Sequence, residues 1–212
     1  RRDTFPAIAL VAAYLHEVRG VMPDEAVAVC PADPYVEEGY FHAVIHLLQS
    51  AQREAAARLI LMGIEPTYPS EKYGYIMPAS RAAESAVLSF REKPDEQTAA
   101  AYIAQGALWN SGVFAFRLGY ALEKAQELLG TASYEKLFHQ YEELPKISFD
   151  YAVVEKETSI AVQRYGGTWL DVGTWNTLAQ VMPECTIGPV TLDETCADVH
   201  VVSTLPMPIL CM

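Results

Sequence analysis

Residues 87–117 constrain the fold more than any other stretch, because they predict two strands on either side of one helix. Good helix formers fill the middle of this stretch, with Asp95 as the N-cap and Gly106 as the stop signal. The expected order is strand, helix, strand: Val87 to Phe90, Glu96 to Gln105, and Val113 to Phe116. A helix that connects two apolar strands is typical of an α/β sheet.

Polar side chains stand where these two strands are expected to end or begin. Arg91, Glu92 and Lys93 follow the first strand, and Asn110 precedes the second. Ligands of open α/β sheets bind at such strand ends. A carboxylate and an amide together accept and donate hydrogen bonds, as sugar hydroxyl groups require. The alternative is that both segments are ordinary solvated turns, since Asn, Ser and Gly favour turns.

The segment from Pro66 to Ile76 is rich in aromatic residues and in residues that break helices and strands. Within it, Gly74 lies between Tyr73 and Tyr75. A glycine backbone beside two aromatic rings suits the close approach of a sugar ring. We therefore expect this loop to contribute to a sugar site.

Apolar strands alternate with helical patterns along most of the remaining chain. Short buried strands are predicted over residues 26–30, 59–64 and 160–165. A long helix is predicted over residues 41–57. This alternation predicts an α/β fold in three layers, with a mostly parallel sheet. We assign residues 1–183 to this domain. Residues 184–212 are expected to form a linker or the start of a β region, because they contain β-branched residues and prolines without a helix signal.

Two aspartates follow strand-like segments that should end on the same edge of the sheet. Asp33 comes after the first apolar strand, and Asp171 follows Trp169-Leu170. Two carboxylates without a histidine or cysteine cluster suit a hard cation such as Mg²⁺, which usually arrives with phosphates. The alternative is that each aspartate is a helix cap or a turn residue.

The charge of the chain limits its partners. The formal net charge of −12 argues against nucleic acid and against an anionic membrane surface. The four cysteines show no zinc-binding spacing, and no apolar run approaches the length of a membrane span. A cytoplasmic protein is therefore expected.

Six motifs then occur in one order along the chain. They are Pro31 to Val36, Gly63 to Thr67 with Tyr73 to Ile76, Phe90 to Pro94, Leu108 to Phe116, Phe149 to Lys156, and Trp169 to Trp175. Together they resemble the bacterial mannose-1-phosphate guanylyltransferases, or GDP-mannose pyrophosphorylases, over nearly the whole chain. The resemblance implies a nucleotide-diphospho-sugar transferase fold. It also implies transfer of GMP from Mg²⁺-bound GTP to mannose 1-phosphate, which gives GDP-mannose and pyrophosphate.

The same resemblance implies roles for individual residues. Three are expected to carry catalysis and five to bind substrate. The first group is Lys93 with the metal ligands Asp33 and Asp171; the second is Gly74, Glu92 and Asn110 at the sugar, with Arg2 and Thr4 beside the guanine base. No general base is expected, because the attacking phosphate is already anionic.

The family also carries an N-terminal glycine-rich loop that holds the triphosphate. By this resemblance the loop and about two strands would lie upstream of Arg1, so the 212-residue chain by itself is expected to have little transfer activity. Members of the family often self-associate, and the resemblance therefore allows a homodimer.

Two other functions remain open at this point. The same fold could act on another nucleoside triphosphate or another hexose 1-phosphate, because Glu92 and Asn110 do not determine the sugar epimer. A non-catalytic protein that binds sugar phosphates would also fit a chain without the phosphate loop. A metal-dependent glycosyltransferase is less favoured, since no Asp-x-Asp pair closes a strand.

Overall fold

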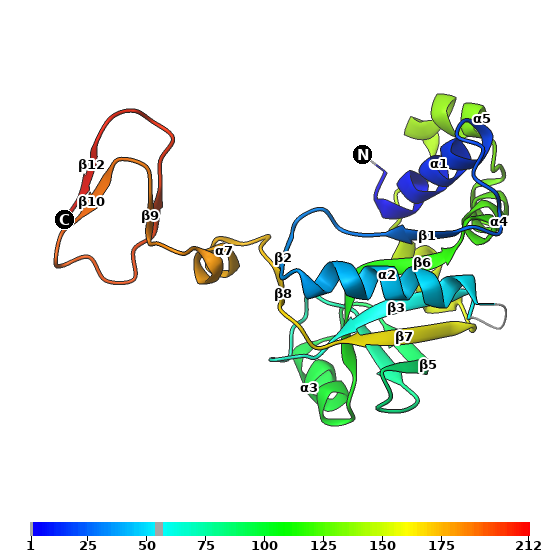
Figure 1. The fold of residues 1–212 in the computed structure, drawn as a ribbon, viewed down its shortest axis with the longest axis horizontal. Helices are drawn as coiled ribbons and strands as arrows, with labels where there is room; N and C mark the ends of the chain where they lie inside the picture. The colour runs from blue at the N-terminus through cyan, green and yellow to red at the C-terminus, as the bar shows by residue number, and fades with distance from the viewer. Residues whose placement is uncertain (1, 54–56) are drawn as a thin grey trace. The chain divides into compact units, whose positions relative to one another are not determined.

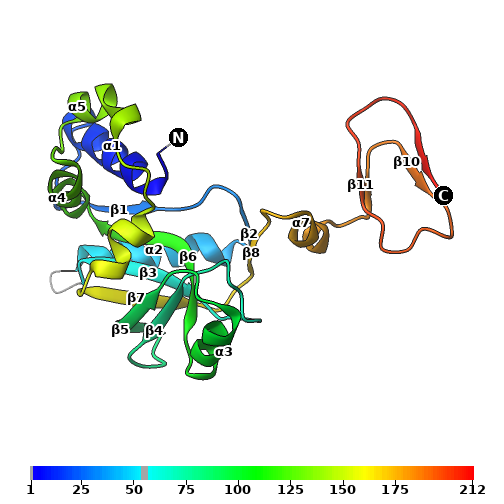
Figure 2. The same ribbon diagram turned by 180° about the vertical axis from the view of Figure 1, so that it is seen from behind.

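The computed structural model describes residues 2–53 and 57–212. The chain divides into two compact units, and each is described by itself. The larger unit combines Arg1–Pro31 with Glu38–Gly167, and the smaller combines Ala32–Glu37 with Thr168–Met212. Figures 1 and 2 show the ribbon from opposite sides. The domain boundary expected after residue 183 stays a prediction.

The larger unit is built on a six-stranded sheet in the order β1-β6-β3-β7-β5-β4. Its strands are β1 (Ala26–Val29), β3 (Leu59–Ile64), β4 (Tyr75–Pro78), β5 (Glu84–Arg91), β6 (Leu108–Arg117) and β7 (Ile160–Tyr165). Every residue of β3 is buried, as the apolar sequence at its position predicts for a strand covered on both faces.

The direction of the strands differs from the prediction. The α/β class is confirmed, but the sheet is mixed rather than mostly parallel. Among its described pairings only β3–β7 is parallel, and β6 runs antiparallel to β1, β3 and β4. A strand covered by side chains on both faces is apolar throughout in either direction, so its sequence does not encode the direction.

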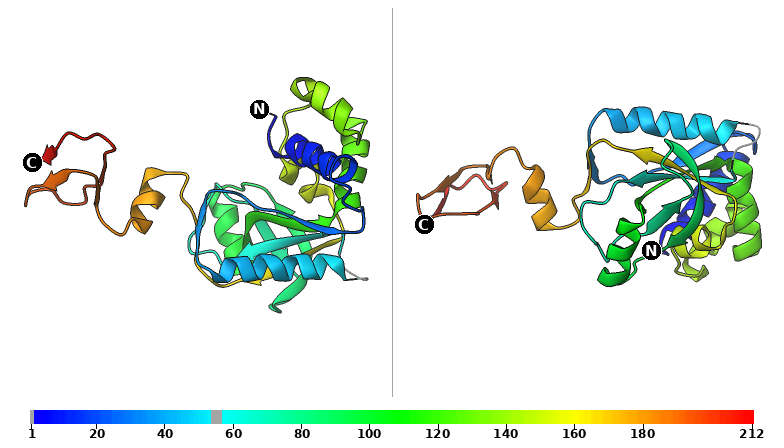
Figure 3. Two further views of the ribbon diagram at one scale, coloured as in Figure 1. Left: turned by 45° about the horizontal axis from the view of Figure 1, so that its top comes forward. Right: turned by 90° about the horizontal axis from the view of Figure 1, so that it is seen from below.

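Helices cover both faces of this sheet, which confirms the predicted three layers. Figure 3 shows α2 on one face and α1, α4 and α6 on the other. The helices of this unit are α1 (Thr4–Glu17), α2 (Gly39–Gln52), α3 (Glu96–Ala104), α4 (Leu118–Leu129), α5 (Tyr134–His139) and α6 (Phe149–Ala152), with 3₁₀ turns at Tyr141–Glu143 and Val154–Lys156. The core beneath α1 and α6 includes Phe5, Leu61, Phe114, Phe116 and Phe149.

Three local predictions had different outcomes. The helix predicted after Asp95 is confirmed as α3, and the Asp95 side chain accepts a hydrogen bond from the Thr98 backbone N–H at 2.8 Å. Asn110 does not precede its strand as expected, because it lies inside β6. Gly112, with φ of +74°, lets this strand continue through a distortion that resembles a turn in the sequence. The helix predicted over residues 41–57 is α2, which begins earlier, at Gly39, and ends earlier, at Gln52, while residues 54–56 lie outside the described residues.

The smaller unit contains a two-stranded antiparallel ribbon, a short helix and two pairs of parallel strands. These elements are β2 (Pro34–Val36), β8 (Trp169–Asp171), α7 (Trp175–Val181), β9 (Thr186–Ile187), β10 (Val190–Leu192), β11 (Val201–Val202) and β12 (Ile209–Cys211). The strands expected near the end of the chain are therefore present. None of the helices in the described part of the chain has the length and apolar character that crossing a membrane requires.

Candidate functional site

Strand register brings three of the predicted residues together at one end of β4. Tyr75, the first residue of β4, pairs with Arg91 of β5 and with Trp109 of β6. Each of these three paired residues has one predicted site residue as its neighbour in sequence: Gly74 precedes Tyr75, Glu92 follows Arg91, and Asn110 follows Trp109. The segments that carry them are 18 residues or more apart in sequence, and the sheet makes them neighbours.

The backbone of Gly74 lies very close to the side chains of Glu92, Phe90 and Asn110. A Cβ atom at position 74 would lie 2.4 Å from Glu92 Oε2, 2.8 Å from Phe90 Cζ and 3.3 Å from Asn110 Cβ. The Asn110 backbone N–H also donates a hydrogen bond of 2.8 Å to the Gly74 carbonyl. Glycine leaves this space to the Glu92 carboxylate, which any side chain at position 74 would displace.

Glu92 and Lys93 present their side chains differently. The Glu92 side chain is 7% exposed and that of Lys93 is 54% exposed, and Lys93 Nζ lies 3.3 Å from Glu92 Oε1. Glu92 Oε2 is buried without a hydrogen-bond partner among the described atoms. Lys93 has φ of +45°, a conformation that costs energy for a residue with a side chain. A buried acceptor next to an accessible cation can receive a hydroxyl group and an anionic group of one ligand.

The surroundings of Glu92 alter its acidity. Burial, followed by the negative charge of Asp150, raises the pKa of Glu92 to about 6. Partial burial lowers the pKa of Lys93, but the charge and the hydrogen bond of the Glu92 carboxylate raise it by more. The pKa of Lys93 therefore lies above its usual value. Shifts of this kind are common at functional sites and also occur in structural ion pairs.

Asp150 was not among the predicted site residues, although its motif, Phe149 to Lys156, was noted. Its Oδ1 accepts a hydrogen bond of 2.7 Å from Asn110 Nδ2. Burial raises the pKa of Asp150, against the lowering effect of this hydrogen bond. A Ser-Phe-Asp sequence is typical of a helix start, so the local pattern gives no sign that this aspartate faces Asn110.

The N-terminal residues Arg2 and Thr4 lie on either side of Asp3, the N-cap of α1. Thr4 Oγ1 accepts a hydrogen bond of 2.8 Å from the Phe149 backbone N–H. Arg2 is partly buried. The structure therefore connects Thr4 to the segment that carries Asp150, while the roles of Arg2 and Thr4 at a base stay predictions.

The two predicted metal ligands lie together in the smaller unit. Pro34, next to Asp33, pairs with Asp171 in the β2–β8 ribbon, and both aspartates are exposed. Asp171 Oδ1 accepts a hydrogen bond of 2.8 Å from the Gly173 backbone N–H. Across residues 2–53 and 57–212, no group of three or more His, Cys, Asp or Glu side chains is arranged to hold a metal ion. Mg²⁺ commonly takes only one or two carboxylates, with phosphates and water, so this pair fits it chemically.

The aromatic residues of the 66–76 loop do not present the two ring faces that the sequence suggested. Tyr75 is 2% exposed, and its hydroxyl accepts a hydrogen bond of 3.0 Å from Trp109 Nε1. The Tyr68 and Tyr73 rings lie 5.0 and 4.8 Å from the Trp109 ring, measured between centroids. The rings thus hold the loop against β6 and fix the backbone before Gly74.

Comparison with known proteins identifies the family. The family model described as "Nucleotidyl transferase" matches residues 1–187. The chain belongs to the nucleotidyl transferase family. The mannose-1-phosphate guanylyltransferase of Escherichia coli is 34% identical over 206 residues, which cover 86% of this chain and 43% of that protein. The xanthan biosynthesis protein XanB of Xanthomonas campestris pv. campestris is 33% identical over 198 residues, which cover 85% and 41%. The chain spans less than half the length of these curated relatives.

Solved structures confirm the fold of this nucleotidyl transferase. A protein of Thermus thermophilus, described as a mannose-1-phosphate geranyltransferase, superposes with a TM-score of 0.77 at 32% identity and covers 99% of this chain and 67% of that one. A UDP-glucose pyrophosphorylase shares the fold with a TM-score of 0.55 at 16% identity, over 85% of this chain and 61% of that one. The predicted nucleotide-diphospho-sugar transferase fold is confirmed.

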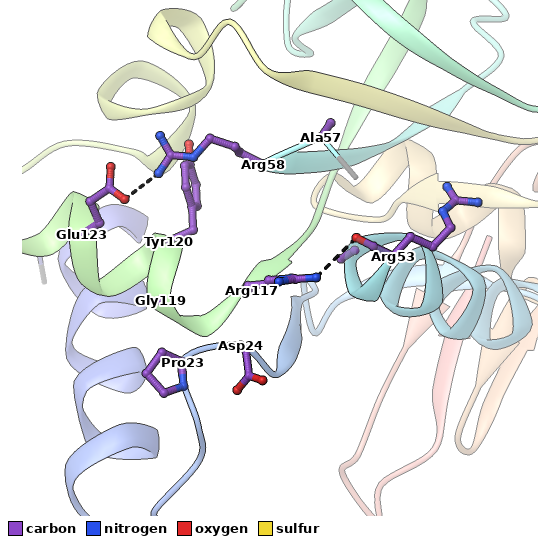
Figure 4. Close-up of a pocket in the computed structure, with 10 residues that line it drawn as sticks. Pro23, Asp24, Arg53, Ala57, Arg58, Arg117, Gly119, Tyr120 and Glu123 are labelled. Atoms are coloured by element: carbon purple, nitrogen blue, oxygen red, sulfur yellow. Dashed lines mark hydrogen bonds and ion pairs between the residues drawn. The ribbon is translucent and has the colours of Figure 1, made fainter. Parts of the chain in front are cut away.

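The larger unit of the nucleotidyl transferase also has a cavity of about 420 Å³ that is lined by Arg53, Arg58 and Arg117 (Figure 4). Arg58 pairs with Glu123 at 2.6 Å, and Arg53 pairs with Glu84. Arg117 donates hydrogen bonds of 3.2 and 3.3 Å to the carbonyls of Gln52 and Arg53 at the end of α2. Because each arginine already has partners within the protein, we assign this cavity a structural role.

The acidity of Glu92 leads to a prediction about stability. Its pKa in the folded protein lies above the ordinary value of 4.5, so ionised Glu92 opposes folding above about pH 6, and this penalty disappears as the pH falls from about 6 to 4.5. Glu92→Gln should therefore raise the free energy of unfolding of the larger unit by about 2 kcal/mol at pH 8 and by little at pH 4.5. Urea unfolding at both pH values measures this difference. An equal gain at both pH values, or none at pH 8, would contradict it.

Proposed function

We propose that this nucleotidyl transferase transfers GMP from GTP to mannose 1-phosphate and so forms GDP-mannose and pyrophosphate. The observation that carries the proposal is the group formed by Gly74, Glu92 and Asn110 with Lys93 at its edge. The names and identities of the curated relatives support mannose 1-phosphate and GTP as the substrates. By the same resemblance we propose a homodimer, which the molar mass from light scattering tests.

The group in the larger unit suits a sugar phosphate. Glu92 offers a buried oxygen without a partner, and Asn110 adds an amide, so hydroxyl groups of a sugar find acceptors and a donor. The glycine backbone at position 74 removes a side chain that would block them. Lys93, a compact cation on a flexible stem, would hold the phosphate of the same ligand.

Asp33 and Asp171 of the smaller unit would bind Mg²⁺, which neutralises negative charge on the nucleotide phosphates. The phosphate of the sugar substrate attacks the α-phosphate of GTP, and pyrophosphate leaves. This nucleophile is already ionised at neutral pH, so the chain's residues do not have to remove a proton. They bind the reactants, orient them and balance their charge. Arg2 and Thr4 are proposed to lie at the base.

The experiment is pyrophosphate release by the complete gene product with GTP, mannose 1-phosphate and Mg²⁺. Other nucleoside triphosphates and hexose 1-phosphates serve as parallel substrates. Release that is fastest with GTP and mannose 1-phosphate supports the proposal. Preference for another nucleotide or hexose would replace the substrates but keep the reaction, and binding without release would favour a non-catalytic protein.

Lys93→Ala should weaken the binding of mannose 1-phosphate by about tenfold or more, because a charge-assisted hydrogen bond to phosphate is lost. The binding of GTP should change much less. Isothermal titration with each ligand measures the two affinities. Lys146→Ala, which removes an exposed lysine outside this group, is the control. Equal losses for both ligands in Lys93→Ala would contradict the assigned role.

A further inference from the structure

Asn110 is held at both ends of its carboxamide. Its Nδ2 donates a hydrogen bond of 2.7 Å to Asp150 Oδ1, and its Oδ1 accepts one of 3.2 Å from the Gly112 backbone N–H. The carboxamide therefore has one orientation, with the NH₂ group toward α6. One N–H of this group is used by Asp150, and the second remains for another acceptor.

Asp150 is itself anchored by its neighbours on α6. The preceding residue, Phe149, is fully buried, and its ring lies 4.9 Å from that of Phe114 and 6.3 Å from that of Phe5. The Phe149 backbone N–H donates to Thr4 Oγ1, and Ser148 caps the helix. The aspartate thus projects from a turn fixed by the core, which is what a residue that positions another side chain requires.

Asp150 also belongs to the charged surroundings of Glu92. The charged groups that act on these two carboxylates are Lys93, Glu155 and Asp3, and Lys93 is the cation among them. Two acids beside one cation carry a surplus of negative charge. Hydroxyl groups of a ligand that donate hydrogen bonds to the pair would stabilise the two carboxylates.

We propose that Asp150 is a positioning residue of the sugar-phosphate site, which fixes the Asn110 carboxamide beside Glu92 so that both groups receive sugar hydroxyls. This inference rests on the proposed function. It assigns Asp150 no contact with the reacting phosphates. Its effect on binding passes through Asn110 and Glu92.

The first test measures the affinity of the complete gene product for mannose 1-phosphate, glucose 1-phosphate and GTP by isothermal titration. Asp150→Ala removes the acceptor, and Asp150→Asn keeps an oxygen that can accept from Asn110. We expect a loss of about tenfold or more in sugar-phosphate affinity for the alanine variant, partial recovery for the asparagine variant, and little change for GTP. Asp24→Asn, an exposed aspartate near the other end of the sheet, is the control. Thermal unfolding shows whether each variant is folded.

The second test is the pH dependence of sugar-phosphate binding. Protonation of Glu92 removes an acceptor, so affinity should fall as the pH drops through the pKa of this group. Asp150→Asn removes a negative charge that raises this pKa, and the midpoint of the fall should therefore move to lower pH. An unchanged midpoint would contradict the part of the proposed effect that passes through Glu92.

The outcomes separate this inference from the proposed function. Binding of mannose 1-phosphate that is the same in the parent and in both Asp150 variants overturns the positioning role alone. Binding of glucose 1-phosphate instead, with a loss in Asp150→Ala, overturns the proposed substrate and supports the positioning role. If the parent protein binds neither hexose 1-phosphate, both are wrong. An unchanged pH midpoint in Asp150→Asn overturns the effect of Asp150 on Glu92.

Discussion

Replacing Gly74 with alanine should lower the affinity of the nucleotidyl transferase for mannose 1-phosphate by on the order of 100-fold. The new methyl group would lie 2.4 Å from Glu92 Oε2 and 2.8 Å from Phe90 Cζ, distances that real structures essentially never show. The Glu92 carboxylate is the end of a side chain and can move more readily than the backbone. Its displacement removes the acceptor on which the proposed sugar contact depends.

Gly74→Ala should affect the stability of the fold less than it affects the binding of mannose 1-phosphate. Overpacking of this size lowers the free energy of unfolding by about 1–3 kcal/mol. Gly166→Ala is the matched control, because a Cβ atom there meets no atom within 4 Å. Isothermal titration and thermal unfolding of both variants make the comparison. Unchanged sugar-phosphate affinity in a folded Gly74→Ala protein would show that the ligand does not approach this backbone.

Asp171→Asn should lower the rate of Mg²⁺-dependent pyrophosphate release by about 100-fold or more. An asparagine keeps an oxygen that can accept the hydrogen bond from the Gly173 N–H, so the turn after β8 is preserved. It loses the negative charge by which a carboxylate holds a magnesium ion more strongly than a neutral amide does. The variant should therefore need a higher Mg²⁺ concentration for half-maximal rate, while its melting temperature stays close to that of the parent.

A close control lies in the same unit. Asp193 Oδ1 accepts a hydrogen bond of 2.9 Å from the Thr195 backbone N–H, two residues further along, as Asp171 does from Gly173. Asp193→Asn should leave the rate and its Mg²⁺ dependence unchanged. Rates of pyrophosphate release measured over a series of Mg²⁺ concentrations show whether either variant needs more Mg²⁺ than the parent. If Asp171→Asn saturates at the same concentration as the parent, Asp171 does not bind the metal.

Helices and strands whose signals lie close together in the sequence were the elements most readily predicted. The helix after Asp95 is set by its cap, its helix formers and Gly106, all within a dozen residues, and the structure confirms it. The β3 strand was predicted from six apolar residues in a row. Because these signals act over short distances, they do not depend on the rest of the chain.

The tertiary structure decided the direction and the length of the strands. The sequence around Asn110 and Gly112 resembles a turn, yet the pairing of β6 with β3 and β4 extends the strand through it. Hydrogen bonds to neighbouring strands outweigh a local preference of this kind. The mostly parallel sheet was predicted wrongly for a related reason, since a buried strand is apolar in either direction.

The sequence by itself determined which residue types could serve a sugar phosphate and a metal ion: the Glu92-Lys93 pair, Asn110, the glycine at position 74 and the two aspartates Asp33 and Asp171. Only the tertiary structure decided which of them meet. Register along β4 brings Gly74, Glu92 and Asn110 into contact, and Asp150, 40 residues from Asn110 in sequence, completes the group through one hydrogen bond. The physical reason is that a carboxylate acquires its role from the atoms around it, and those atoms come from segments that only folding brings together.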